Sequence, residues 1–551
     1  MSDPEFVELL PKREDTRQRK LISNSGVTTH GEREQRTVTI TGEALENLAY
    51  EAFKEVNFFL RPDHLAQLRT IFDDEEASSN DRVVALDLLK NANIASGGVL
   101  PMCQDTGTAL VYARRGHRIS SDGKDQEHLS RGIARAYNEL NLRFSQLAPL
   151  TTWEEVNTGT NLPAEIEISF CEGDSYEFLF MAKGGGSANK SFLFQETRSI
   201  LEEERMLEFL REKIEAIGTA ACPPYHLAIV IGGTSADYAL KTAKLASTRF
   251  LDDLPSRGNG LGSGMRDREF EQKVLEMTQT LGFGAQFGGK YFCHDVRVIR
   301  LPRHGGSLPI AIAVSCSADR QILGRITSEG VFLEELEHDP SKYLPDFGVS
   351  HASPPDDGVF INLNRPISEV QAELSNLTIG ERVLLSGEIV VARDAAHAKW
   401  RAMLEAGKSL PEYTMKYPIY YAGPSKTPEG KPSGSFGPTT AGRMDSYVDL
   451  LQSRGASLIT LAKGNRSSAV AKSCQEYGGF YLGTVGGPAA LIAQENIKKV
   501  DLIDFPELGM EAVYRITVQN FPAFVVIDDK GNDFYSHGRK TGIKISRRPD
   551  V

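Results

Sequence analysis

The sequence predicts a mixed α/β fold in two parts: an N-terminal helical and mixed-sheet domain of α+β character, followed by a smaller C-terminal α/β domain. The chain has 551 residues, whereas one hydrophobic core rarely organises more than about 300. Apolar residues recur at helical spacing in some segments and form short strand-like runs in others. A stretch rich in Asp, Pro, Ser and Gly at residues 338–358 separates two regions of different pattern.

Residues 1–40 are polar and charge-rich and form an N-terminal extension that carries no motif. A long helix is expected to begin near Thr41, because apolar residues then recur at helical spacing. These residues are Leu45, Leu48, Ala49, Ala52 and Phe53. A second helix is expected over residues 81–95, since a glycine pair follows it as a helix end.

The rest of the N-terminal domain, which we place at residues 41–337, alternates strands and helices. The expected elements are paired strands at 166–170 and 178–181, an amphipathic helix at 199–217 and a buried strand at 227–231. Two further strands at 296–301 and 310–314 bracket a Gly-containing connection. This pattern predicts a hairpin that carries His304.

The segment at 338–358 has the composition of a linker and marks the domain boundary. Beyond it, strand-like and helical patterns alternate in the C-terminal α/β domain at residues 359–551. The expected elements are strands at 382–391, 418–421 and 457–461 and helices at 395–406 and 440–453. Such alternation implies parallel strands joined by helical crossovers.

The charge of the chain limits its partners. A formal net charge of -12 argues against nucleic acid or an anionic membrane, because both require a basic face. The longest apolar runs are too short to span a bilayer. Asp3, Glu5 and Glu8 occur where a mitochondrial presequence avoids acidic residues. The cytoplasm is therefore the expected location, although a mitochondrial form would differ mainly in its leader.

Six cysteines without a Cys-x-x-Cys pair form neither a disulfide framework nor a zinc ribbon, which favours a reducing compartment. Cys103, Cys222 and Cys316 each lie in a turn rich in Gly, Pro or small polar residues, so they are candidate metal ligands. Their spacing alone gives no cluster signature. The remaining cysteines fit the ordinary role of small apolar core residues. They are Cys171, Cys293 and Cys474.

Three segments, together with the order of the two domains, resemble class I fumarate hydratases nearly from end to end of the chain. The segments are Pro101–Thr108, Ala182–Ser191 and Gly437–Asp445. The resemblance implies a homodimeric hydro-lyase of the tricarboxylic acid cycle that adds water reversibly to fumarate, giving L-malate. It also implies a 4Fe-4S cluster held by Cys103, Cys222 and Cys316. Three thiolates leave one iron open to act as a Lewis acid, and an open iron makes the activity oxygen-sensitive.

The resemblance also assigns the residues that bind the dicarboxylate substrate. They are Gln104, Asp105, Arg143, Gly186, Arg393, Thr439, Arg443 and Lys463. Arg393 and Lys463 each follow a predicted strand, and open α/β sheets bind ligands at the carboxyl ends of strands. An arginine also grips a carboxylate with a bidentate fork.

Three residues are expected to act in catalysis. In the malate-to-fumarate direction, Asp105 assists the departure of the C2 hydroxyl as water, and Thr439 removes a C3 proton. Thr439 begins a predicted helix in which Thr440 is expected to be the N-cap, so the helix end and nearby cations would stabilise the Thr439 alkoxide. His304 is the third candidate, on the strength of the resemblance. Whether subunits share active-site groups is left open.

Other functions compete with this interpretation. Tartrate dehydratases and mesaconases share the chemistry, and their substrates differ by one hydroxyl or methyl group. Residues 184–191 nearly fit the phosphate loop G-x-x-x-x-G-K-S of a nucleotide-binding protein, but Asn189 stands in place of the second glycine. An electron-transfer protein would usually complete all four cysteine ligands of a cluster.

Overall fold

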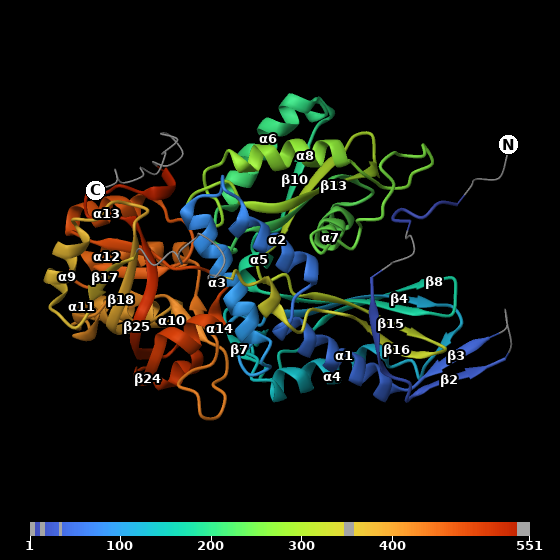
Figure 1. Ribbon diagram of the computed structural model, residues 1–551, viewed down its shortest axis with the longest axis horizontal. Coiled ribbons are helices and arrows are strands. Elements are labelled where there is room, and N and C mark those ends of the chain that lie inside the picture. Colours follow the sequence, from blue (N-terminus) through green and yellow to red (C-terminus); the bar gives the residue numbers. More distant parts are fainter. Residues whose placement is uncertain (1–5, 12–16, 32–35, 347–357, 537–551) are drawn as a thin grey trace.

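The computed structural model describes residues 6–11, 17–31, 36–346 and 358–536. Helices and sheets of the N-terminal residues fill one side of the molecule, and the C-terminal residues, orange and red in Figure 1, form a body of their own. The predicted mixed α/β class is confirmed. Among the described residues, no helix is both long and apolar enough to cross a membrane.

A six-stranded mixed sheet lies beside helices α1 (Gly42–Phe58) and α4 (Asp125–Glu139) (Figure 1). Its strands, in spatial order, are β1 (Arg19–Ser23), β16 (Gly330–Glu334), β15 (Gln321–Thr327), β9 (Tyr176–Lys183), β4 (Thr108–Gly116) and β8 (Glu165–Cys171). The predicted first helix is confirmed by α1. It begins after Thr41 because the Thr41 hydroxyl caps it, accepting from the Ala44 N–H at 3.3 Å. Its five predicted apolar residues are fully buried against the sheet.

The predicted pairing of the strands at 166–170 and 178–181 is wrong. Strand β4 lies between β8 and β9, parallel to the first and antiparallel to the second. The sequence did not reveal β4, because its centre is buried on both faces and shows no alternation. The N-terminal extension also takes part, since β1 forms the edge of the sheet beside β16. Its strands β2 (Val27–His30) and β3 (Thr37–Ile40) form a small sheet with β5 (Ile119–Ser120).

A second, five-stranded sheet lies in the upper part of Figure 1. Its strands, in spatial order, are β10 (Phe192–Glu196), β14 (Leu308–Ser315), β11 (Tyr225–Gly233), β13 (Cys293–Arg303) and β12 (Met265–Arg266). The helices that pack on it are α6 (Glu203–Ile217), α7 (Ala236–Ala246) and α8 (Arg268–Gln279). Strand β11 is buried along its whole length, as predicted. Ala228 and Val230 pack with α7, whereas Leu227 and Ile229 belong to the core that contains α6 and α8.

Strands β13 and β14 follow one another in the chain but do not pair. Strand β11, which comes earlier in the sequence, lies between them, parallel to β13 and antiparallel to β14. The predicted hairpin is therefore wrong, and the connection that carries His304 passes over the end of β11. Local sequence cannot reveal such a strand insertion, because the inserted strand is distant in the chain.

The C-terminal body is built on a seven-stranded sheet. In spatial order its strands are β17 (Val359–Asn362), β18 (Arg382–Val391), β19 (Ile419–Tyr420), β22 (Ile459–Ala462), β23 (Phe480–Gly483), β25 (Val513–Ile527) and β24 (Ile497–Asp504). The accompanying helices are α9 (Ile367–Leu374), α10 (Asp394–Glu405), α12 (Asp445–Gln452) and α13 (Ser468–Tyr477). The predicted parallel pairing is confirmed from β17 to β23. Strand β25 pairs antiparallel with both β23 and β18, so the sheet folds back on itself.

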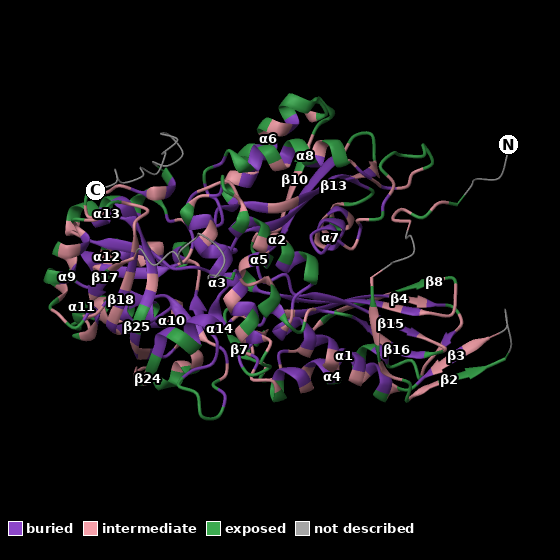
Figure 2. Ribbon diagram, in the orientation of Figure 1, coloured by how far each residue is buried: buried purple, intermediate pink, exposed green. Residues whose placement is uncertain are grey.

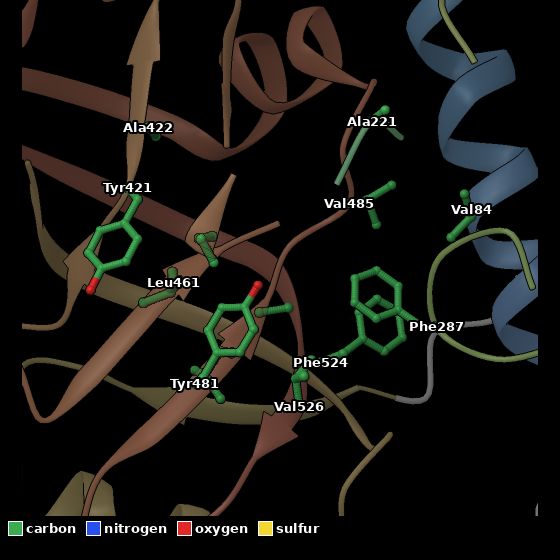
Figure 3. Close-up of a cluster of buried hydrophobic side chains, with 14 of the residues drawn as sticks. Val84, Ala221, Phe287, Tyr421, Ala422, Leu461, Tyr481, Val485, Phe524 and Val526 are labelled. Atoms are coloured by element: carbon green, nitrogen blue, oxygen red, sulfur yellow. The ribbon is translucent and has the colours of Figure 1, made fainter. Parts of the chain in front are cut away.

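Part of the predicted linker, residues 347–357, lies outside the described residues. The two parts of the molecule nevertheless share one apolar core (Figure 2). Figure 3 shows its centre, where the ring of Phe287 stacks on Phe524 at 4.0 Å between centroids. Val84 of α3 (Ser79–Ala95) packs beside it. The neighbouring helix of this junction is α2 (Pro62–Asp73), and its core residues Leu65 and Leu68 are fully buried.

Candidate active site

Three loops bring the predicted thiol ligands together. Cys222 lies just before β11 and Cys316 just after β14, and these antiparallel strands pair His226 with Ser315, so the two loops meet. Cys103 lies in the loop that leads into β4. The charge of each thiolate affects the others, which places all three in one group. All are free thiols.

The thiols lie in a buried environment that contains positive charge. Burial raises the pKa of Cys103 and raises that of Cys222 to about 11. The cations Arg320 and Lys463 act in the opposite direction. The Lys463 ammonium contacts Cys222 Sγ at 2.8 Å. Without a metal the Cys103 and Cys222 thiols therefore stay protonated at neutral pH, and metal binding must displace their protons.

The geometry of these sulfur ligands fits a cluster better than a single ion. Thiolates bound to one tetrahedral ion lie about 4 Å apart, because each metal–sulfur bond measures about 2.3 Å. Within the described part of the chain, the three sulfur atoms do not all lie within 4.8 Å of one another. Their mutual influence nevertheless shows that they face a common space. This wider spacing suits an iron-sulfur cluster, whose ligands bind different irons.

A second group of potential metal ligands has a structural explanation. In the described residues, His64, His226 and Asp319 form the one group with ligand atoms within 4.8 Å of one another. The imidazoles are hydrogen-bonded to each other, with His64 Nδ1 and His226 Nε2 3.0 Å apart, and Arg249 donates to Asp319 at 2.6 Å. A guanidinium at this distance would repel a metal cation. His64 Nε2 also contacts the Ser317 carbonyl at 3.0 Å, so the group supports the loop after β14.

A cavity of about 90 Å³ brings the predicted substrate-binding residues together. All eight of them line it: Gln104, Asp105, Arg143, Gly186, Arg393, Thr439, Arg443 and Lys463. The first four belong to the N-terminal part of the chain and the last four to the C-terminal part. Lys463 links the cavity to the thiols, because its ammonium also contacts Cys222. The cavity thus combines four cationic side chains with the Asp105 carboxylate and the hydroxyl-bearing residues Thr439 and Thr440.

Asp105 is held by backbone donors and by positive charge. Its carboxylate accepts from the N–H of Gly107 at 3.2 Å and from the N–H of Gly185 at 2.8 Å. Arg143 lies 3.5 Å from it. Burial alone would raise the pKa of Asp105, but Arg143, Arg320 and the Gly185 N–H outweigh burial and hold this pKa below its ordinary value. Asp105 is therefore an ionised carboxylate at neutral pH and a proton acceptor.

Thr439 is fixed by its backbone and oriented by one cation. Its N–H donates to the Tyr421 carbonyl at 2.8 Å, and its carbonyl accepts from the Lys463 N–H at 3.2 Å. The Arg443 guanidinium donates to its hydroxyl at 3.0 Å, and its other edge is paired with Asp394. This arrangement places a positive charge against the oxygen that would become an alkoxide.

The predicted helix at 440–453 is divided. A 3-10 turn, η4 (Ala441–Met444), precedes α12. Thr440 occupies the N-cap position of this turn, but its side chain makes no capping hydrogen bond. The prediction that the Thr440 side chain caps this helix is therefore wrong. Thr440 instead lines the cavity beside Thr439, and its backbone bridges to Lys463.

Arg393 and Gln104 are each held by a hydrogen bond to a backbone carbonyl. Arg393 is buried and donates to the Met510 carbonyl at 2.8 Å, and burial with the nearby Arg143 lowers its pKa to about 10. It stays protonated at neutral pH and is available for a carboxylate. The Gln104 amide donates to the Pro438 carbonyl at 3.2 Å, which joins the two parts of the chain across the cavity.

His304 is not among the residues that line this cavity. It is exposed on the connection between β13 and β14, where its ring accepts from the Gly306 N–H at 3.1 Å. Strand β14 then carries the chain about 25 Å to Cys316, at about 3.3 Å per residue. His304 therefore does not reach the cavity of its own chain.

The phosphate-loop alternative has no structural support. The helix after Gly184, α5 (Gly185–Ala188), has four residues, and strand β10 begins soon after it. A phosphate loop requires a long helix at this position, because its N-terminus helps to bind the phosphates. The Lys190 ammonium turns instead towards the Ala216 carbonyl, at 3.5 Å.

Two charged residues near the cavity were not predicted from the sequence. Asp394 pairs with Arg443, and its position directly after Arg393, at the end of a predicted strand, was a usable signal. Arg320 influences Cys103 and Asp105, and it lies four residues after Cys316. Its burial could not be predicted from the sequence, since most arginines lie at the surface.

Comparison with known proteins identifies the family. The chain matches the family described as "Fumarate hydratase (Fumerase)" over residues 46–325 and "Fumarase C-terminus" over residues 330–538. It is 56% identical over 502 residues to "Fumarate hydratase 2" of Leishmania major, covering 91% of this chain and 88% of that protein. It is 55% identical to "Fumarate hydratase class I, anaerobic" of Escherichia coli, with 90% of each chain covered.

A more distant relative matches about half of the chain. The "Putative L(+)-tartrate dehydratase subunit alpha" of Methanocaldococcus jannaschii is 33% identical over 293 residues, which is 51% of this chain and 97% of that protein. The two fumarate hydratases named above cover 91% and 90% of this chain. The two family matches, the high identity over most of the chain and the shared order of both halves establish that this chain belongs to the class I fumarate hydratase family.

Proposed function

We propose that the chain catalyses the reversible hydration of fumarate to L-malate, using a 4Fe-4S cluster held by Cys103, Cys222 and Cys316. The observation that carries the proposal is the cavity in which cationic side chains of both halves meet beside the three thiols. When bound, such a cluster supplies a Lewis acid at the iron that lacks a protein ligand. The protein side chains then bind the dicarboxylate and move the protons.

The cations of the cavity suit a substrate with two carboxylates. Arg143, Arg393, Arg443 and Lys463 all line the cavity, and arginine forks bind carboxylates in a fixed orientation. The amide of Gln104 adds a neutral polar group. The local positive charge compensates for the net charge of -12, which would otherwise repel a dianion.

Asp105 and Thr439 divide the proton transfers. In the hydration direction the ionised Asp105 accepts a proton from water, and the water oxygen forms a bond to C2. The electron pair of the double bond takes up a proton from the Thr439 hydroxyl at C3. After product release a proton passes from Asp105 to the Thr439 alkoxide, which restores the carboxylate and the hydroxyl. In the reverse direction the proton first passes from Thr439 to Asp105. Asp105 then gives it to the departing hydroxyl, and the Thr439 alkoxide, stabilised by Arg443, removes the C3 proton.

We also propose that the enzyme works as a homodimer in the cytoplasm. Free cysteines are in keeping with a reducing compartment. The exposed His304 does not reach the cavity of its own chain. In a dimer it can act in catalysis by lying at the cavity of the other subunit. We therefore assign His304 to the cavity of the second subunit.

Anaerobic assays test the function. The protein purified without oxygen should convert L-malate to fumarate, lose this activity in air and regain it on reconstitution with iron and sulfide. Parallel assays with tartrate and mesaconate test the related hydro-lyases, and the partial match to a tartrate dehydratase subunit makes tartrate the second candidate substrate. Turnover of tartrate alone would replace the proposal, and a colourless, iron-free protein that is still active would remove the cluster from it.

A further inference from the structure

Arg320 is a buried cation whose hydrogen-bonding capacity is not used. It lies between Asp319 and the first residue of β15, and its exposed fraction is 4%. Within the described part of the chain, its Nε and Nη1 atoms have no hydrogen-bond partner. Buried charged donors without hydrogen-bond partners destabilise a protein. A buried guanidinium without acceptors for its N–H groups therefore indicates that a hydrogen-bond acceptor binds here.

The surroundings of Arg320 define that acceptor. The guanidinium lies near Cys103, Cys316 and Asp105, and all three raise its pKa once they are charged, against the effect of burial. A Cβ atom on Gly184 would lie 3.3 Å from its Nη2 atom, so the guanidinium packs directly on this glycine turn. No carboxylate in the described residues lies within 4.0 Å of Arg320 as an ion-pair partner. The Asp105 carboxylate is instead bound by backbone N–H groups and lies 3.5 Å from Arg143.

We propose that Arg320 donates hydrogen bonds from its unpartnered Nε and Nη1 atoms to sulfur atoms of the bound 4Fe-4S cluster, on the side of Cys103 and Cys316. Arg320 is then a positioning residue that sets the reduction potential of the cluster and protects it from oxidation. This inference rests on the proposed function, because it requires the cluster. Lys463 is placed to act on the remaining thiolate, Cys222, through its contact at 2.8 Å.

The physical consequence follows from charge. A cluster bound by thiolates is anionic, and hydrogen bonds to its sulfur atoms together with a nearby cation stabilise the more reduced state. Removal of this cation makes the loss of an electron to oxygen easier. Loss of one charge-assisted hydrogen bond corresponds to about a tenfold change in equilibrium.

Two substitutions test the proposal. R320K keeps the charge but loses the planar fork, and R320Q loses the charge while keeping one amide donor. The matched controls are R266K and R266Q, because Arg266 is also buried but is fully paired with Glu271 at 2.7 and 2.9 Å. The anaerobically purified full-length proteins are compared for iron content, for the midpoint of an electron-paramagnetic-resonance redox titration and for the rate of cluster bleaching in air.

We expect R320Q to bleach about tenfold faster in air than the unsubstituted protein, with a more negative midpoint potential, and R320K to fall between the two. The two Arg266 variants should keep the original potential. A potential and bleaching rate unchanged in R320K and R320Q would overturn the proposal. If both Arg320 variants lose iron, the iron-stripped chains are compared in thermal unfolding. The same unfolding temperature as the iron-stripped unsubstituted protein would support the proposal. A lower unfolding temperature would overturn it in favour of a folding role.

The measurements also separate this inference from the proposed function. If the unsubstituted protein contains the cluster and hydrates fumarate while the Arg320 variants match it, the inference alone is wrong. If the unsubstituted protein binds no iron, the proposed cluster chemistry fails before any variant is compared.

Discussion

The Arg443 guanidinium donates to the Thr439 hydroxyl at 3.0 Å while Asp394 holds the opposite edge of the same guanidinium. The cation is thus fixed in orientation by a carboxylate that lies away from the hydroxyl it serves. A free threonine hydroxyl is a poor base, and this contact supplies the positive charge that an alkoxide needs. Thr439 and Arg443 therefore form a hydrogen-bonded pair that suits the proposed proton transfer.

The hydroxyl of Thr439 is the first target for substitution. Thr439→Ala should lower kcat for L-malate dehydration by about 100-fold to 10,000-fold, because general acid and base groups contribute in this range. Thr439→Ser keeps the hydroxyl and should stay within about tenfold of the original rate. Cluster absorbance, measured on the same samples, should be unchanged. Near-normal turnover of the alanine variant would exclude Thr439 from proton transfer.

The ion pair of Asp394 with Arg443 is the second target for substitution. Asp394→Asn removes the charge that orients Arg443, and it should reduce kcat/KM about threefold to tenfold, a modest effect because the pair is partly exposed. Glu405→Gln, which disrupts the exposed Arg401–Glu405 pair on α10, is the matched control and should leave kinetics unchanged. Equal effects of the two substitutions would contradict a specific role for Asp394.

Iron content should divide the six cysteines into two groups. Substitution by serine at Cys103, Cys222 or Cys316 should lower iron per chain to less than about a tenth of the original value, because a hydroxyl is a poor ligand for iron-sulfur clusters. Serine at Cys171, Cys293 or Cys474 should leave the iron content intact. Retained iron in a variant of the first group would show that the assignment of that ligand is wrong.

Burial of His397 predicts a pH dependence of stability. Burial lowers its pKa to about 4, although its Nδ1 atom lies 2.8 Å from the Arg393 carbonyl. In the unfolded chain this histidine binds a proton below its ordinary pKa of about 6.5. The unfolded state therefore binds more protons between pH 6.5 and 4, and stability falls by up to about 3 kcal/mol as the pH drops through this window.

Urea unfolding at a series of pH values measures this effect. His397→Asn keeps a donor for the Arg393 carbonyl but cannot bind the proton. Below pH 6.5 its free energy of unfolding should therefore fall less steeply, by about 1.4 kcal/mol per pH unit. Above pH 7 the two proteins should show parallel pH profiles. Identical profiles below pH 6.5 would mean that His397 does not titrate as its burial requires.

Mixed dimers test the assignment of His304 to the second subunit. His304→Asn and Thr439→Ala chains should each be inactive alone. Co-expressed in equal amounts, half of their dimers are mixed and each mixed dimer has one intact site, so the activity should recover to about a quarter of normal. A mixture that stays inactive would show that His304 acts within its own chain, and an active His304→Asn homodimer would remove it from catalysis.

The sequence predicted local features better than long-range ones. The α1 helix and the parallel strands from β17 to β23 follow from apolar periodicity and from alternation, which are properties of neighbouring residues. The partners of β8 and β13 depend on strands inserted from elsewhere in the chain, β4 and β11, and no local pattern encodes them. A strand buried on both faces, such as β4, also lacks the alternation by which strands are recognised.

The site shows the same division. The thiol of Cys222 meets that of Cys316 because β11 and β14 pair in one register, which the spacing of the two cysteines does not reveal. The composition of their turns made these thiols candidate metal ligands, and the cluster assignment followed from resemblance to a family. The buried donors of Arg320 and the contact of Lys463 with Cys222 depend on packing between distant segments, so they required the three-dimensional structure.

The shared lining of the cavity has a consequence for assembly. Because each half supplies four of the eight residues, neither half alone can make the chamber. A relative named as a tartrate dehydratase subunit is matched along 97% of its own length by only 51% of this chain, so about half of this chain corresponds to a separate polypeptide there. Joining both halves in one chain keeps them in equal amounts and at a high effective concentration, so dilution cannot separate the two walls of the reaction chamber.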